Sequence, residues 1–253
     1  MKRTLEVLFS PAEFNMLGTR DLSGSVCVVF DVLRATSVMV KALSENAEGI
    51  IPVGTIQEAV ALHHKKPGLV LAGERHGLRI MADQSGGVSF QLGNSPREFT
   101  REKVGGKTIV TTTTNGTRAL QSCRGASEVL IASFLNLDVV AGYLAKEKAR
   151  SLVIVCSGTG EEAAYEDTLG AGALCSALVE NGFDGRVIDS TRIAMAVYQQ
   201  EQIDLLGAMQ RASNGARLLG IPELKDDVEF CLQRNAIPLL AQMGADGVVM
   251  RRG

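Results

Sequence analysis

The chain has 253 residues, of which 45% are hydrophobic, and its formal net charge at pH 7 is -2. This length and apolar content are sufficient for a sizeable buried core, and neither sign of charge is gathered into a tail. The overall charge therefore excludes a general attraction to nucleic acid or to an anionic membrane, and an anionic ligand would have to be held by a few local arginines and a metal.

The N-terminal residues Met1–Phe9 contain a short apolar run interrupted by Glu6, which lacks the apolar core of a secretory signal. No apolar stretch approaches the roughly 20 residues needed to cross a bilayer. The five cysteines are widely spaced without a C-x-x-C pair, which favours reduced thiols. We therefore expect a cytoplasmic protein with neither nucleic acid nor a membrane as partner, and the sequence leaves a homo-oligomer open.

Short and mostly continuous apolar runs predict β-strands that are covered on both faces. They alternate with helix-like stretches, so the predicted class is α/β with largely parallel sheets flanked by helices. The strands are expected at Leu5–Phe9, Val26–Phe30, Ile50–Val53, Leu69–Leu71, Thr108–Thr112, Val129–Ala132, Leu152–Cys156 and Val248–Met250. The helices are expected at Ala35–Leu43, Ile56–His64, Thr117–Ser122, Asp138–Lys148 and Asp167–Glu180.

From about Ser190 onward the chain is predicted to be mostly helical and to pack over the sheet, with breaks at Asn214-Gly215 and at Gly220–Pro222. No low-complexity linker divides the sequence, so residues 1–253 are expected to form one catalytic unit. The Gly- and Pro-containing stretch Ser85–Gly106 is the candidate boundary for two α/β lobes, 1–99 and 100–253.

The first polar segment with an unusual composition is D-V-L-R-A-T, which directly follows a predicted apolar strand. It places the carboxylate of Asp31, the guanidinium of Arg34 and the hydroxyl of Thr36 in one loop. Such a set suits an anion that is held beside a metal ion. The alternative is that Asp31 only caps the helix that follows.

Two further polar segments follow along the chain. In G-E-R-H-G, Glu74 and Arg75 stand between glycines after a predicted strand, and the alternative to a site is a solvated surface pair. In L-G-N-S-P, Asn94 and Ser95 precede a proline that opens a helix, and the alternative is plain helix capping. Taken alone, neither segment decides between the two interpretations.

The hydroxyl-rich run Thr111–Thr117 lies between a predicted strand and a predicted helix. Threonine is common in strands, but a strand is not expected to continue through an Asn-Gly pair. Hydroxyls and backbone N–H groups just before a helix are typical of an anion cradle. The residues expected to bind substrate here are Thr114, Asn115, Gly116, Thr117 and Arg118.

The last polar segment, Gly158–Ala163, has the form G-x-G-x-x-A of a dinucleotide fingerprint. Glu161 and Glu162 would repel a pyrophosphate at this place, which weakens the match. Glu166 and Asp167 begin the next predicted helix. They would either interact favourably with the helix dipole or bind a hard divalent cation such as Mg²⁺.

In this order, the motifs D-V-L-R-A-T, G-E-R, L-G-N-S-P, T-T-N-G-T and C-S-G…E-D resemble those of the 2-phosphosulfolactate phosphatase family, strongly over Asp31–Gly172 and more loosely over Asp227–Cys231. The resemblance implies an α/β fold particular to this family and Mg²⁺-dependent hydrolysis of (2R)-phosphosulfolactate to 3-sulfolactate and phosphate. In methanogens this reaction belongs to coenzyme M biosynthesis. Family members also occur in bacteria that do not make coenzyme M, so the physiological substrate does not follow.

With this resemblance, the residues expected to be catalytic are Asp31, Arg34, Glu74 and Arg75. The expected metal ligands are Asp31, Glu74, Glu166 and Asp167. The residues expected to bind the small anionic phosphate ester are Thr36, Asn94, Ser95, Thr114, Asn115, Gly116, Thr117 and Arg118.

For the chemistry, attack by a metal-activated water is favoured over Asp31 as a covalent nucleophile. Phosphatases that resemble haloacid dehalogenases carry a second Asp two residues after the nucleophile, and Leu33 stands at that position here. The alternative function is a nucleotide- or anion-binding α/β module without catalysis.

Overall fold

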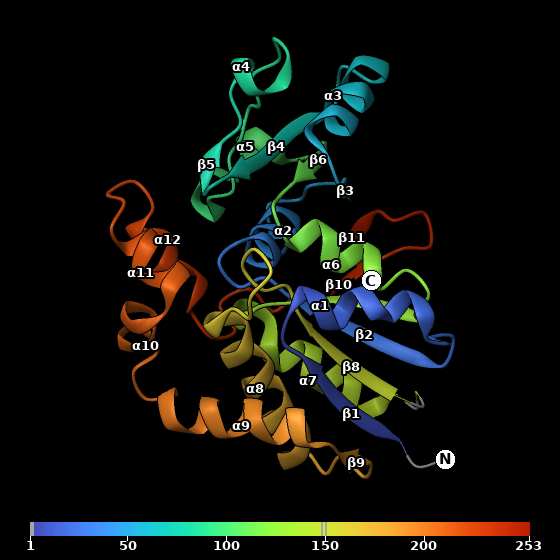
Figure 1. The fold of residues 1–253 in the computed structure, drawn as a ribbon. Helices are drawn as coiled ribbons and strands as arrows, with labels where there is room; N and C mark the ends of the chain where they lie inside the picture. Colours follow the sequence, from blue (N-terminus) through green and yellow to red (C-terminus); the bar gives the residue numbers. More distant parts are fainter. Residues whose placement is uncertain (1–2, 148, 150) are drawn as a thin grey trace.

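The computed structural model describes residues 3–147, 149 and 151–253. Within these residues the strands form a single sheet of 11 strands in the order β5-β4-β6-β3-β11-β10-β7-β2-β8-β1-β9. Helices lie around this sheet (Figure 1), so the predicted α/β class with largely parallel strands is confirmed. Across the ranges that the structure describes, every helix is too short or too polar to span a membrane.

The larger parallel part of the sheet, the main block, has β2 and β8 at its centre. Its strands are β7 (Glu128–Ala132), β2 (Ser25–Phe30), β8 (Ser151–Cys156), β1 (Thr4–Leu8) and the short β9 (Arg186–Val187). Side chains alternate across it: Val26 and Val28 belong to one hydrophobic cluster, and Cys27 and Val29 belong to another. Both faces of these strands are therefore buried, which explains why their sequences are continuous apolar runs.

The helices on the two faces of the main block follow the same division into clusters. One face is covered by α7 (Leu137–Lys146), α8 (Tyr165–Glu180) and α9 (Asp189–Glu201). The other is covered by α1 (Pro11–Phe14), the 3-10 helix η1 (Asn15–Thr19), α2 (Ala35–Ser44) and α6 (Gly116–Ser122). The predicted helix Asp138–Lys148 corresponds to α7, and its predicted last residue, Lys148, lies outside the described residues.

A smaller parallel part of the sheet, the minor block, consists of β3 (Gly49–Pro52), β6 (Thr108–Thr112) and β4 (Val70–Arg75), with the short antiparallel β5 (Leu78–Arg79) at its edge. The helix α3 (Ile56–Lys65) packs on this block through a separate hydrophobic cluster. The segments around it are α4 (Ala82–Ser85), the 3-10 helix η2 (Pro96–Glu98) and α5 (Arg101–Val104). Strand β6 follows the candidate boundary near residue 99 and pairs with β3 and β4, which precede it.

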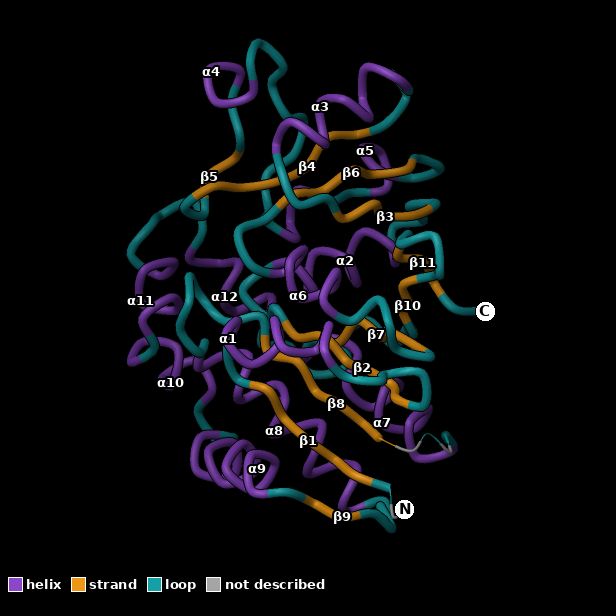
Figure 2. The backbone as a smooth tube through the Cα atoms, turned by 45° about the vertical axis from the view of Figure 1, so that its right-hand side comes forward, coloured by secondary structure: helices purple, strands orange, loops and turns teal. Residues whose placement is uncertain are grey.

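The C-terminal strands β10 (Ala241–Met243) and β11 (Val249–Arg251) lie between the two blocks (Figure 2). They pair antiparallel with each other, β10 pairs antiparallel with β7, and β11 pairs antiparallel with β3. Following these pairings along the sheet, the main block and the minor block run in opposite directions.

The segment after Ser190 is mostly helical, as predicted, and continues from α9 through α10 (Leu205–Arg211), α11 (Ser213–Leu219) and α12 (Lys225–Cys231). The predicted break at Asn214-Gly215 is wrong, because both residues lie in the first turn of α11. Gly215 serves close packing instead: a Cβ at this position would lie 2.5 Å from the Met209 carbonyl oxygen. The break at Gly220 is confirmed.

Candidate active site

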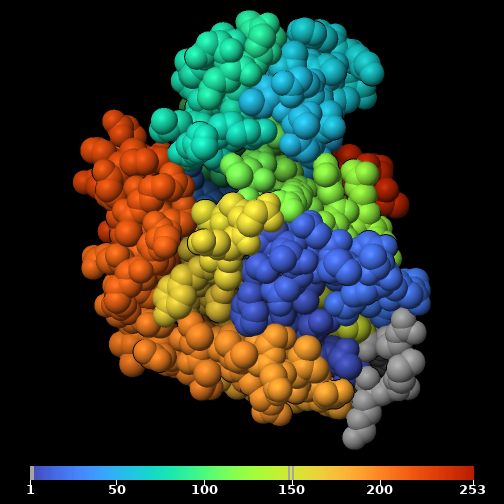
Figure 3. Space-filling model, in the orientation of Figure 1, coloured from blue at the N-terminus to red at the C-terminus, as the bar shows by residue number. Residues whose placement is uncertain are grey.

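A cavity of about 390 Å³, the polar cavity, lies where loops that follow β2, β4, β6 and β8 meet α11. In Figure 3 the orange-red surface of the C-terminal helices adjoins the teal surface of the minor block and the yellow loop after β8. The lining contains six of the predicted site residues: Asp31, Arg34, Glu74, Asn94, Thr114 and Asn115. The structure therefore brings together segments that are more than a hundred positions apart.

Asp31 is the first residue after β2 and is 9% exposed. Its Oδ1 accepts a hydrogen bond from the N–H of Ala35 (3.0 Å), the first residue of α2. The Thr36 hydroxyl donates to the Asp31 carbonyl (2.9 Å), which closes this loop. Burial, with a smaller contribution from the charges of Glu74 and Glu166, raises the pKa of Asp31 to about 6.

Glu74 is buried near the end of β4, so the interpretation of Glu74 and Arg75 as a solvated surface pair is wrong. Its Oε1 accepts hydrogen bonds from the N–H and the hydroxyl of Thr114 (both 2.9 Å), and its Oε2 accepts one from the N–H of Gly77 (2.7 Å). Arg75 donates to the Glu74 carbonyl and to the Thr112 hydroxyl instead. It lies outside the lining of the polar cavity, whereas Glu74 lies within it.

Asp167, in the first turn of α8, is buried and connects the loops that follow β2 and β8. Its Oδ1 accepts a hydrogen bond from the N–H of Val32 (2.8 Å). Its Oδ2 accepts from the Ser157 hydroxyl (2.9 Å) and from the N–H of Gly158 (3.1 Å). Burial, followed by two neighbouring carboxylates, raises the pKa of Asp167 well above its usual value. An interaction with the helix dipole alone does not account for this arrangement.

Glu166 precedes Asp167 and is equally buried. Its Oε1 accepts a hydrogen bond from the side-chain amide of Asn214 (2.6 Å). Its Oε2 is buried and has no hydrogen-bond partner among the residues that the structure describes. Burial raises the pKa of Glu166, although the amide of Asn214 and the charge of Arg217 act in the opposite direction. A buried carboxylate oxygen without a partner is costly and indicates an ion or a water at this place.

The loop after β6 approaches Asp31 closely because it contains Gly116. A Cβ at Gly116 would lie 2.5 Å from Asp31 Oδ2, so a side chain here would displace the carboxylate. The amide of the neighbouring Asn115 donates to the carbonyls of Ser157 and Gly160 (both 2.9 Å). These bonds join the carboxyl end of β6 in the minor block to that of β8 in the main block.

Four predicted substrate-binding side chains lie outside the lining of the polar cavity and bond within the protein. The hydroxyls of Thr36 and Thr117 donate to backbone carbonyls. The Ser95 hydroxyl donates to Asp227 Oδ1 (2.7 Å), so plain helix capping by Ser95 is wrong. Arg118 pairs at the surface with an exposed glutamate at 2.6 Å. Their assignment to substrate binding stays a prediction.

Arg34 lines the polar cavity, but its guanidinium is 2% exposed and bonded within the protein. One nitrogen donates to Asp227 Oδ2 (2.5 Å) and another to the Gly77 carbonyl (2.7 Å). Asp227 is fully buried and also accepts from the Ser95 hydroxyl and from Arg97 Nε (2.8 Å). This carboxylate thereby fixes the loops that contain Arg34 and Ser95 to α12.

The Gly158–Ala163 loop does not have the geometry of a dinucleotide fingerprint. Thr159 and Glu162 exchange backbone hydrogen bonds at 3.0 and 3.1 Å, which closes the loop into a tight turn. Helix α8 begins only at Tyr165, and its first turn contains two buried carboxylates. A pyrophosphate therefore has no helix N-terminus free of negative charge at this position.

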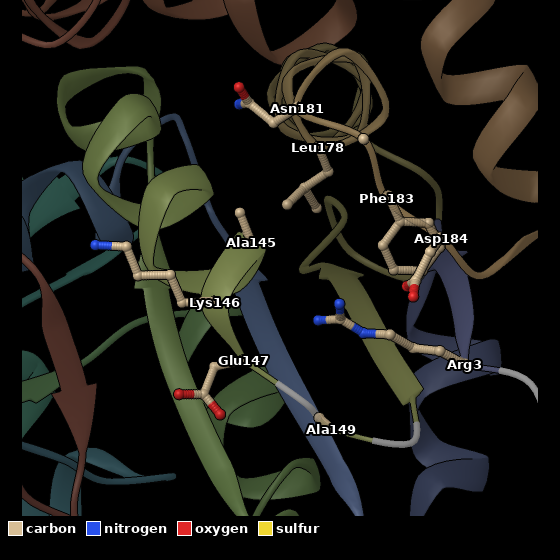
Figure 4. Close-up of a pocket in the computed structure, with 10 residues that line it drawn as sticks. Arg3, Ala145, Lys146, Glu147, Ala149, Leu178, Asn181, Phe183 and Asp184 are labelled. Atoms are coloured by element: carbon tan, nitrogen blue, oxygen red, sulfur yellow. The ribbon is translucent and has the colours of Figure 1, made fainter.

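A larger cavity of about 650 Å³ lies at the opposite ends of β1 and β8 (Figure 4). Its charged side chains come from the N-terminal strand, the end of α7 and the loop after α8: Arg3, Lys146, Glu147 and Asp184. These carboxylates are half-buried or exposed, in contrast to those near the polar cavity. Size therefore does not select the candidate active site here, and the buried acids favour the polar cavity.

Comparison with known proteins gives a consistent result. A sequence model described as 2-phosphosulpholactate phosphatase matches residues 14–245. The chain is 41% identical to a "Probable 2-phosphosulfolactate phosphatase" of Thermotoga maritima, over 81% of this chain and 82% of that protein. The chain belongs to the 2-phosphosulfolactate phosphatase family.

Two further members of the 2-phosphosulfolactate phosphatase family cover nearly the whole chain. A protein of the same name from Caldanaerobacter subterraneus is 36% identical over 93% of this chain and 94% of its own length. One from Synechocystis is 35% identical over 88% of this chain and 90% of its own length. The family and the enzyme class predicted from the sequence, a phosphoric monoester hydrolase, are confirmed.

The residues around the polar cavity fit a Mg²⁺ ion that is held by one or two carboxylates, but they do not enclose it completely. No set of three or more His, Cys, Asp or Glu side chains in the described part of the chain is arranged to enclose a metal. Mg²⁺ is commonly held by only one or two carboxylates, together with waters and substrate phosphate. Glu166 Oε2 and Asp31 Oδ2 suit this role, because both oxygens of Glu74 and of Asp167 already accept hydrogen bonds.

The residues that line the polar cavity of this phosphatase family member and that sequence reasoning missed include His76, Asn214 and Arg217. Asn214 and Arg217 belong to α11, which lies beyond the strongly matching motifs. The pair Asn214-Gly215 was interpreted as a helix break, so the amide was not considered as a site residue. Asp227 was missed because an acid in the first turn of a helix is ordinarily explained by the helix dipole.

Proposed function

We propose that this protein is a Mg²⁺-dependent phosphatase that hydrolyses 2-phosphosulfolactate, or a similarly small anionic phosphate ester, to 3-sulfolactate and phosphate. The observation that carries this proposal is the unpartnered buried oxygen Glu166 Oε2, close to Asp31 and Asp167, whose pKa values are raised by burial and by neighbouring carboxylates. Such an excess of buried negative charge is stabilised by a bound cation. The names of the relatives support hydrolysis of a phosphate ester.

Asp31 and Glu166 would hold the metal, and other residues fix the loops around it. When bound, Mg²⁺ would neutralise charge on the phosphoryl group and lower the pKa of the attacking water. Asp167 fixes the loops after β2 and β8 through its three hydrogen bonds. Glu74 fixes the Thr114 loop.

Asn94 supplies a donor for the substrate. Its side chain lines the polar cavity, is 6% exposed, and makes no hydrogen bond within the described ranges of the chain. The amide is therefore available to an oxygen of the phosphate ester without breaking an existing bond. Holding the reacting groups in place and stabilising charge account for most of the acceleration in phosphoryl transfer.

Nucleophiles from the protein are less well supported than water. The thiol of Cys156 is fully buried, and burial raises its pKa well above the usual value, so it stays protonated. Asp31 is followed two residues on by Leu33, where phosphatases that resemble haloacid dehalogenases carry a second Asp. Recovery of phosphorylated Asp31 after rapid acid quenching would favour the covalent alternative.

The experiment that tests the proposal is a phosphate-release assay on 2-phosphosulfolactate and other small phosphate esters, with and without EDTA. We expect chelation to abolish turnover and added Mg²⁺ to restore it. Undiminished activity in excess EDTA would show that the reaction needs no metal. Retention of ATP or NAD in equilibrium dialysis, without phosphate release from any ester, would favour the binding-module alternative instead.

A second readout does not depend on turnover. Mg²⁺ should raise the melting temperature of the wild type, and Glu166→Gln should lose this shift because it removes the unpaired charge. Glu180→Gln is the matched control, because Glu180 is exposed at the far end of the same helix. An equal Mg²⁺ shift in both variants would remove Glu166 from the metal site.

We further propose that the protein works in a reducing compartment such as the cytoplasm. Cys27, Cys123, Cys156, Cys175 and Cys231 are all unpaired and buried, which supports this placement.

A further inference from the structure

Two arginines line the polar cavity, and their partners differ in charge. Arg34 is buried and forms a salt bridge with Asp227. Arg217 is exposed and donates to the His76 carbonyl (3.1 Å) and to Asn214 Oδ1 (2.6 Å), which are neutral acceptors. It forms no salt bridge with any residue that the structure describes, so no direct carboxylate contact neutralises its charge.

The guanidinium of Arg217 is held in one place despite its exposure. Asn214, which accepts from it, is itself fixed by hydrogen bonds from its amide to the Leu33 carbonyl (3.1 Å) and to Glu166. Gly77 leaves room for the guanidinium, because a Cβ there would lie 2.7 Å from Arg217 Nη1. The positive φ of Gly77, 83°, also disfavours any residue with a side chain. A cation positioned in this way binds an anion at little further entropic cost.

Other nearby arginines do not offer the same charge to the cavity. Arg97 pairs with two aspartates of α12, and Arg118 pairs with Glu161 at the surface. Both lie outside the lining of the polar cavity. Arg217 is also separate from the loops after β2, β6 and β8, because it belongs to α11 and contacts the turn between β4 and β5.

We infer that Arg217 binds an anionic group of the substrate other than the phosphoryl group and thereby determines specificity for phosphate esters of charged acids. This inference rests on the proposed phosphatase function. The group recognised is a carboxylate or a sulfonate, since a guanidinium fork binds the oxygens of either one. Arg217 is a specificity-determining residue, whereas the metal is assigned to Asp31 and Glu166, and Arg217 contacts Glu166 only through Asn214.

The test measures kcat/KM for four enzymes on four substrates, and the substrates differ only in which charged groups they carry besides the phosphate. The substrates are 2-phosphosulfolactate, 2-phospholactate without the sulfonate, the phosphate ester of 1-sulfopropan-2-ol without the carboxylate, and isopropyl phosphate without either group. The enzymes are the wild type, Arg217→Gln, Arg217→Lys and the control Arg211→Gln. Arg211 is an exposed arginine of the neighbouring α10 that pairs with Glu201, so its removal changes the net charge equally.

We expect Arg217→Gln to lower kcat/KM for 2-phosphosulfolactate by about 10- to 100-fold, the usual effect of losing a charged hydrogen bond. The loss should be much smaller for esters that lack the recognised group, and the two single-group esters identify which group it is. Arg217→Lys should recover part of the loss, mainly in KM, and Arg211→Gln should behave as the wild type.

Two results would overturn the inference. An equal loss on all four esters, including isopropyl phosphate, would place Arg217 on the phosphoryl group or give it a structural role. Unchanged kinetics on every ester would show that it contacts no substrate. Phosphate release from none of the esters by the wild type would instead refute the proposed function itself, which separates the two failures. Melting temperatures measured on the same samples verify that each variant is folded.

Discussion

Asp31→Asn replaces a buried carboxylate by a neutral amide of nearly the same shape, and we expect it to stabilise the metal-free protein while abolishing most of kcat. The pKa of Asp31 rises from 3.8 to about 6 in the folded protein. A shift of about two units corresponds to about 3 kcal/mol of unfavourable free energy for the ionised form. Because neighbouring carboxylates share this cost, we expect a gain of about 1–3 kcal/mol in the free energy of unfolding.

The sign of this effect depends on pH. The folded protein holds a proton on Asp31 more tightly than the unfolded chain does. The contribution of this proton to the free energy of unfolding is therefore fully present below about pH 4 and is lost as the pH rises through about 6. The variant should therefore be more stable than the wild type at pH 7.5 in EDTA, and the difference should vanish near pH 4. Added Mg²⁺ should reverse the order at pH 7.5, because it stabilises only the charged site.

The assay is thermal unfolding at both pH values, with kcat measured on the same samples. For a protein of this size, each kcal/mol changes the melting temperature by about 2–4 °C. Asp184→Asn is the matched control, because Asp184 is exposed in the loop before β9. A variant that is no more stable than the wild type at pH 7.5 in EDTA would refute the argument, and an unchanged stability would favour Asp31 as a helix cap, because Asn caps helices about as well as Asp. Near wild-type kcat would remove Asp31 from the site.

Two further predictions concern close contacts near the same cavity. Asp227→Ala should lower the free energy of unfolding, measured in urea, by about 3–5 kcal/mol because it leaves the buried charge of Arg34 unpaired. Asp226→Ala should lower it by less than about 1 kcal/mol because that aspartate is exposed. Equal costs would contradict the buried ion pair. Gly116→Ala should lower kcat by displacing a carboxylate, while Gly142→Ala, with open space around it, should leave kcat unchanged and add about 0.5–1 kcal/mol of stability. Full activity in Gly116→Ala would show that this close approach is not needed.

The strands of the two parallel blocks could be predicted because a strand that is buried on both faces has a continuous apolar sequence, such as Val26–Phe30. The short strands β5 and β9 have two residues each, which is too few to show any periodicity. Strand β10 also went unpredicted, since its place between β7 and β11 depends on pairing with distant segments rather than on its own three residues.

The same distinction separates the site residues that could be predicted from those that could not. Asp31 and Glu74 are acids close to strand ends, and that position, together with the order of the motifs, indicates a site. The partner of Arg34 lies 193 positions further along the chain, so its salt bridge with Asp227 has no local signature. Without that partner in view, Arg34 was expected to be a catalytic residue, whereas the structure places its guanidinium in a buried ion pair.

The arrangement of the sheet explains how distant strand ends come to share one cavity. Strands that run in opposite directions in a flat sheet present their carboxyl ends at opposite edges, yet Asn115 after β6 bonds to Ser157 after β8. Six steps between neighbouring strands separate β6 from β8. At about 20–25° a step, the twist accumulates to roughly 120–150°, which nearly reverses the direction of one block relative to the other. The strands β10 and β11 take part in three of these pairings, which set the opposite direction and contribute to the twist, so the C-terminal strands are part of what brings the two carboxyl edges together.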